Sequence, residues 1–141
     1  MNVIKNSKVT RMINATAVGT TTLTPGTSLD MQGFESVLFI ALFGTITDGT
    51  PDLQPRQDTA VGMGTATNIG AAVSMLDADD NKVGLVEAIH PTKRYVDCQI
   101  VRGGSTGCVF DGLIAVQFGA KESPVTQDAT VGAAVATYVA P

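Results

Sequence analysis

The sequence predicts an all-β protein, a single-domain antiparallel β-sandwich or barrel-like fold that ends in an extended C-terminal arm. Helical periodicity is scarce along the chain, whereas short β-branched runs bounded by Gly, Pro, Asn or Asp recur throughout. A length of 141 residues fits one domain with one core. We therefore expect a β-domain over residues 1–124 and an arm over residues 125–141.

The β-branched runs place the expected strands along the chain in the following order. They are Val9–Ala17, Thr20–Leu23, Glu35–Ile46, a short piece near Leu53, Ala72–Leu76, Lys82–Ile89, Arg94–Arg102 and Gly107–Phe118.

The strand Glu35–Ile46, within "FESVLFIALFGTI", is apolar on both of its faces. Because strand side chains alternate, one face carries one apolar set and the other face carries another. The two sets are Val37, Phe39, Ala41 and Phe43, and Leu38, Ile40 and Leu42. We expect a central strand that is covered twice, by the opposite sheet and by a loop, an arm or a neighbouring subunit.

Two segments between the long strands have turn or loop composition. "TDGTPDLQPRQD" predicts a turn and then an edge-type segment, since neither Pro51 nor Pro55 can donate a hydrogen bond to a ladder. "TAVGMGTATNIGAA" is rich in glycine and almost uncharged, which predicts a long loop or a poorly paired edge strand.

The C-terminal stretch "VTQDATVGAAVATYVAP" alternates small apolar and polar residues and carries one charged side chain, Asp128. This composition is too apolar for a solvated tail. We expect the arm to add as a strand to an exposed sheet edge of a neighbouring molecule. The alternative is that it forms the last strand of its own sandwich. The expected interaction residues are Val131, Val135, Tyr138 and Val139.

The low charge content and the short apolar runs argue against nucleic acid and membranes as partners. Charged residues make up 16% of the chain, against about 25% in an average soluble protein. Only nine Lys and Arg residues are present and the net charge is −4, so we expect no direct binding of nucleic acid. The longest apolar run, Val37–Phe43, is far shorter than the roughly 20 residues that cross a bilayer, so no membrane partner is expected. A neutral surface with 44% apolar residues instead indicates that protein partners cover part of it.

The N-terminus "MNVIKNSKV" lacks the apolar region of a secretory signal, so we expect the protein to be made in a cytoplasm, with its two cysteines as free thiols.

The stretch "HPTKRYVDCQIVRGGSTGCVFDG" holds both cysteines and the only histidine, His90. If "GGST" is the loop of a hairpin, alternation directs Cys98 inward and places Cys108 on an apolar stripe. That stripe is Cys108, Phe110, Ile114, Val116 and Phe118. A disulfide would then require a slip in register.

No metal, cofactor or catalytic constellation emerges from the sequence. One His and two Cys at these spacings do not match a zinc pattern. A cysteine nucleophile paired with His90 is disfavoured by the inward position of Cys98, and His90 is expected at a strand end before Pro91. Asp77, Asp79 and Asn81 match the first ligands of a calcium loop, but Lys82 occupies the position that requires Gly, so an acidic turn is expected. We predict that the protein is not an enzyme.

Three sequence blocks together resemble a family of small virion proteins of tailed bacteriophages that are encoded near the major capsid protein. The blocks are "VLFIALFGTITDGTPDLQPRQD", "DADDNKVG" and "KRYVDCQIVRGGSTGCVFDGLIAVQFG". The resemblance spans roughly Phe34 to Pro124 and lies in the order and spacing of the blocks. It implies a capsid decoration or cement protein that lies on the capsid exterior, after assembly in the host cytoplasm. The implied partners are the major capsid protein and the chain itself, as a homotrimer first and a dimer second, because cement proteins match capsid symmetry axes.

Two other functions stay open from the sequence. Within virions, the alternative is a head-tail connector or tail-tube protein, which would form a ring. A carbohydrate-binding β-sandwich module is the remote alternative. It is disfavoured because the chain has no Trp and its only tyrosines are Tyr95 and Tyr138, whereas sugar-binding faces usually present several aromatic side chains.

Overall fold

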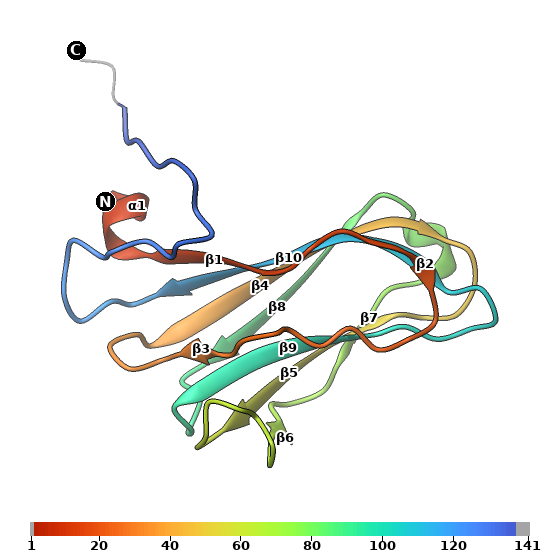
Figure 1. Ribbon diagram of the computed structural model, residues 1–141, viewed down its shortest axis with the longest axis horizontal. Helices are drawn as coiled ribbons and strands as arrows, with labels where there is room; N and C mark the ends of the chain where they lie inside the picture. The colour runs from red at the N-terminus through yellow and green to blue at the C-terminus, as the bar shows by residue number, and fades with distance from the viewer. Residues whose placement is uncertain (1, 138–141) are drawn as a thin grey trace.

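The computed structural model describes residues 2–137 as two antiparallel β-sheets packed face to face, which confirms the predicted all-β sandwich (Figure 1). Sheet A contains β1 (Lys8–Ile13), β2 (Thr16–Gly19), β4 (Ser36–Ile46), β8 (Val83–Ile89) and β10 (Cys108–Phe118). Sheet B contains β3 (Leu29–Asp30), β5 (Asp52–Asp58), β6 (Thr67–Asn68), β7 (Val73–Ser74) and β9 (Tyr95–Val101). A short helix, α1 (Val3–Asn6), precedes β1, and a 3-10 turn, η1 (Asp77–Asp79), precedes β8.

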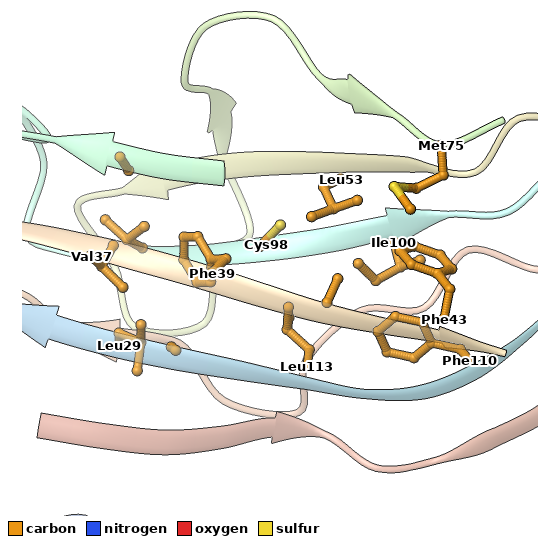
Figure 2. Close-up of a cluster of buried hydrophobic side chains, with 14 of the residues drawn as sticks. Leu29, Val37, Phe39, Phe43, Leu53, Met75, Cys98, Ile100, Phe110 and Leu113 are labelled. Atoms are coloured by element: carbon orange, nitrogen blue, oxygen red, sulfur yellow. The ribbon is translucent and has the colours of Figure 1, made fainter. Parts of the chain in front are cut away.

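The strand order explains which strands build the core. Sheet A runs β1-β10-β4-β8, with β2 also paired to β10, and sheet B runs β3-β9-β5-β6, with β7 also paired to β5. The two central strands of each sheet direct their inward side chains into the space between the layers. Figure 2 shows this core, in which Phe39 and Leu113 of sheet A face Cys98 and Ile100 of sheet B.

The aromatic part of the core joins the two longest strands. Phe43 of β4 and Phe110 of β10 are almost fully buried, and their rings meet edge to face with centroids 5.3 Å apart at 74°. This geometry is favoured by the ring quadrupoles and adds to the burial of apolar area.

The expected hairpin around "GGST" is wrong, because β9 and β10 belong to different sheets. The loop between them is fixed by Asp48, whose carboxylate accepts hydrogen bonds from the backbone N–H groups of Ser105, Thr106 and Gly107. Gly107 adopts a φ of +81°, and a Cβ there would lie 1.9 Å from the carbonyl oxygen of Gly19. Only glycine fits this crossing between the layers.

The expected apolar stripe of β10 is also wrong beyond Phe110. The pairing of β10 with β4 shifts register between Phe110 and Gly112, as a β-bulge does, and the bulge reverses the alternation of faces. Cys108 and Phe110 therefore point inward as expected, but Leu113 is the next buried large side chain. The stripe residues Ile114, Val116 and Phe118 are half-buried on the other face.

Several expected strands differ from those found. The run Val9–Ala17 splits into β1 and β2, and Thr20–Leu23 contributes only an isolated bridge between Leu23 and Ile100. Strand β5 is longer than the expected piece near Leu53, and it pairs on both sides, so the expected edge-type segment is wrong although the strand contains Pro55. The carbonyl of Pro55 accepts a hydrogen bond from the N–H of Ile69 at 2.8 Å, so the backbone of this residue faces the gap between β6 and β7 and not β9. The missing N–H of proline therefore removes no hydrogen bond from the β5–β9 ladder.

The glycine-rich segment after β5 is a loop with the two-residue strand β6, in agreement with the sequence. Asp58, which is fully buried, anchors it by accepting hydrogen bonds from the backbone N–H groups of Thr59, Ala60 and Thr65. Burial alone would raise the pKa of Asp58, but the hydrogen bonds from Thr65, Ala60 and Thr59 outweigh it and lower the pKa to about 2. Asp58 is therefore a charged carboxylate when it holds the loop.

Candidate interaction surface

The C-terminal segment is held on the N-terminal edge of the domain before it departs. The side-chain oxygen of Gln127 accepts a hydrogen bond from the N–H of Val9 at 2.9 Å, and the hydroxyl of Thr130 accepts one from the N–H of Arg11 at 2.9 Å. The amide nitrogen of Gln127 also donates to the carbonyls of Ile4 and Ser7. Two side chains therefore occupy donors at the open edge of β1, in place of a paired strand.

The four expected interaction residues fall in different surroundings. Val131 is half-buried at a shallow hollow that Leu42 and Ile114 also line. Val135 is 76% exposed on the part of the chain that runs away from the sandwich (Figure 1). Tyr138 and Val139 lie outside the described residues. Within residues 119–137 no strand forms, so the described part of this segment is not a strand of its own sandwich.

The outward side of sheet A carries an apolar surface that we call the outer face. Its members come from three neighbouring strands and are half-buried or exposed. They are Leu38, Ile40 and Leu42 of β4, Val83, Leu85 and Ile89 of β8, and Ile114, Val116 and Phe118 of β10. The second apolar face expected for β4 is thus present, and sheet B covers only the opposite side of the strand.

The exposed part of the outer face lies on β8 and was not found from the sequence. Val83, Leu85 and Ile89 are 49%, 55% and 62% exposed. In "KVGLVEAIH" both alternating sets contain apolar residues, so the sequence does not show which set faces water. Burial of Gly84 and Ala88 identifies the inward set: a Cβ at Gly84 would lie only 3.0 Å from the Leu53 side chain.

The two cysteines lie where the sequence indicated, inside the core. Cys98 and Cys108 are free and almost completely buried, on strands of different sheets. Burial raises the pKa of the Cys98 thiol to about 12 and raises that of Cys108 as well. Both residues therefore act as small apolar side chains, and neither presents a thiolate.

We expect replacement of Cys98 and Cys108 by alanine to lower the free energy of unfolding by about 1 to 2 kcal/mol per site, because each substitution removes one buried sulfur from a packed core. Reaction of the native wild-type protein with a thiol reagent should be slow and should accelerate on denaturation. Rapid labelling of both thiols in the native protein would contradict this assignment.

The remaining polar candidates have structural surroundings. His90 is exposed at the end of β8, and its N–H donates to the carbonyl of Glu35 at 3.1 Å. Asp77 and Asp79 lie in η1, where the Asp79 carboxylate accepts hydrogen bonds from the N–H of Leu76 and the ammonium of Lys82. This is the acidic turn that the sequence predicts.

Within residues 2–137, no three His, Cys, Asp or Glu side chains gather closely enough to hold a metal ion. Over the same residues, no helix has the length and apolar character needed to cross a bilayer. Comparison of the chain with protein-family models, with curated proteins and with solved structures gives no match.

Proposed function

We propose that this chain is a structural virion protein of a tailed bacteriophage, a decoration or cement protein that binds the major capsid protein on the outside of the shell. The observation that carries the proposal is an apolar outer face on sheet A beside a C-terminal segment that leaves the domain with Val135 exposed. A contiguous exposed apolar surface is typical of a site of protein association.

The composition and the sequence resemblance support the same function. Charged residues make up only 16% of the chain. Association with a second protein surface therefore requires the desolvation of few charged side chains. The three blocks that resemble phage virion proteins include β4, β9 and β10. These strands form the centre of the sandwich, so the resemblance lies in the part of the chain that builds the domain.

In this proposal the sandwich supplies a rigid body and the arm supplies the clamp. Residues 125–131 are already ordered against β1 by Gln127 and Thr130, which lowers the entropy cost of presenting the following residues to a partner. Each fully buried valine then contributes about 1.5 to 3 kcal/mol to association.

Deletion of the residues after Val131 tests the clamp. Because Gln127 and Thr130 remain in place, we expect the thermal midpoint of the free protein to stay within about 3 °C of wild type. The dissociation constant from purified particles of the encoding phage should rise at least about tenfold, so that washed particles retain fewer copies, since burial of one valine already exceeds the 1.4 kcal/mol that corresponds to a factor of ten.

The control is Val61→Ala, which shortens an exposed valine in the loop after β5. Val61 is 63% exposed, against 76% for Val135 in the deleted segment. This variant should keep wild-type occupancy on the particle. Full retention of the truncated protein, measured by quantitative gel analysis of washed particles, would show that the arm is not the clamp.

A further inference from the structure

The open edge of β8 has a hydrogen-bonding pattern that can be derived from its partner strand. The N–H of Phe43 donates to the carbonyl of Lys82, and the N–H of His90 donates to the carbonyl of Glu35, both at 3.1 Å. Bonded and non-bonded pairs alternate along an antiparallel ladder, so the even-numbered residues of β8 bond to β4. The odd-numbered residues direct their N–H and C=O groups away from the sheet. They are Val83, Leu85, Glu87 and Ile89.

These outward groups have no hydrogen-bond partner within residues 2–137, because β8 is the last strand of sheet A and no loop bonds to its free side. The side chains of the same residues point to the outer face, with Leu85 55% and Ile89 62% exposed. An edge of this kind is normally blocked by a proline, a bulge or charged side chains, most often lysine. Strand β8 contains no proline, bulge or lysine, and its single charged side chain is Glu87.

The chain covers its other long edges with its own segments. The free side of β1 is met by the side chains of Gln127 and Thr130. On sheet B, β9 is flanked by the two-residue strand β3 and by Leu23, which exchanges two hydrogen bonds with Ile100, and β5 is flanked by β6 and β7. Strand β8 is therefore the one long edge in the described chain that is left bare.

We propose that β8 is a self-association edge, which pairs antiparallel with β8 of a second copy about a two-fold axis, so that sheet A continues through both molecules. A two-fold axis is the operation that brings the same strand edge against itself in antiparallel orientation. The inference concerns the free protein and does not depend on the proposed virion function.

Full overlap of the two strands, together with the position of Glu87, favours one register for this pairing. Full overlap of the strand places Val83 opposite Ile89 of the second copy and Leu85 opposite Glu87 of the second copy. All four residues lie on the outer face, where directly opposite side chains contact one another. A register that places the two Glu87 carboxylates opposite each other shortens the overlap and sets like charges in contact, which is unfavourable.

This register makes a prediction that depends on the sign of a charge at position 85. In Leu85→Glu, each new carboxylate lies opposite Glu87 of the second copy, so we expect the dissociation constant of the dimer to rise at least about tenfold. In Leu85→Lys, an ammonium lies opposite that carboxylate, and the dissociation constant should stay within about threefold of wild type. Sedimentation velocity over a concentration series measures all three proteins.

Val61→Glu is the matched control, since it adds the same charge at a similarly exposed apolar side chain away from β8, 63% exposed against 55% for Leu85. It should dimerise as wild type does, and circular dichroism should show that every variant keeps its strand content. A wild-type protein that stays monomeric at high concentration would overturn the proposal. Equal weakening by Leu85→Glu and Leu85→Lys would overturn the β8 pairing, because simple loss of an apolar contact does not depend on the sign of the charge.

Discussion

Substitution of Arg56 by alanine is expected to lower the free energy of unfolding by about 3 to 5 kcal/mol, because it leaves the carboxylate of Asp97 buried and unpaired. Arg56 and Asp97 are direct cross-strand partners on β5 and β9. They form a bidentate pair with nitrogen–oxygen distances of 3.0 and 2.6 Å, and the Asp97 side chain is only 2% exposed. Chemical denaturation with a far-ultraviolet signal measures the loss.

The chain supplies a control for this substitution. Arg94 and Asp30 form a second bidentate arginine–aspartate pair, at 2.9 and 2.7 Å, but their side chains are 51% and 45% exposed. Water solvates both charges when such a pair is broken, so Arg94→Ala should cost much less than Arg56→Ala. Equal losses for the two substitutions would mean that burial of Asp97 does not determine the cost.

The second large effect is expected for Phe110→Ala, which should cost about 3 to 5 kcal/mol. The substitution removes a fully buried ring, leaves a cavity and breaks the edge-to-face contact with Phe43. Phe118→Ala on the same strand should cost only about 1 to 2 kcal/mol, because Phe118 is half-buried on the outer face. Differential scanning calorimetry of both variants gives the comparison.

This pair of substitutions also tests the bulge in β10. Uninterrupted alternation would place Phe110 and Phe118 on the same face, and both would then belong to the core. If the two substitutions destabilise the protein equally, the reversal of faces between Phe110 and Gly112 is wrong.

The long strands could be predicted because their residues determine them locally. The expected ranges Glu35–Ile46 and Gly107–Phe118 begin within one residue of β4 and β10 and end at the same residues. Both are dense in β-branched and aromatic side chains, which favour extended structure in any all-β context. The same pattern placed Phe39 and Phe43 together on one face of β4, but both faces are apolar, so it did not show that this face is the buried one.

The short strands and the assignment of strands to sheets could not be predicted, because they depend on contacts between residues that are distant in the sequence. The strands β3 and β6 have two residues each and exist only through pairing with β9 and β5. The loop that carries the chain from β9 to β10, in the other sheet, is held by Asp48, which lies more than fifty positions earlier in the chain. No local pattern in "GGST" carries that information, since its composition also suits a hairpin.

The candidate surface was predictable only in part for the same reason. The doubly apolar character of β4 indicated that a second face would need a cover, and the outer face is that surface. The bare edge of β8 follows from the strand order, which a single sequence does not specify. The docking of Gln127 and Thr130 on β1 likewise has no local signal, because these side chains reach residues at the opposite end of the chain.

Electron cryo-microscopy of phage particles purified from a culture that expresses this chain tests the proposed function most directly. The proposal predicts density for the two-sheet domain in many symmetry-related copies on the outer surface of the shell, with the segment after Val131 in contact with the major capsid protein or a neighbouring copy. Density confined to a ring at the neck or within the tail tube, or purified particles that lack the chain, would contradict it.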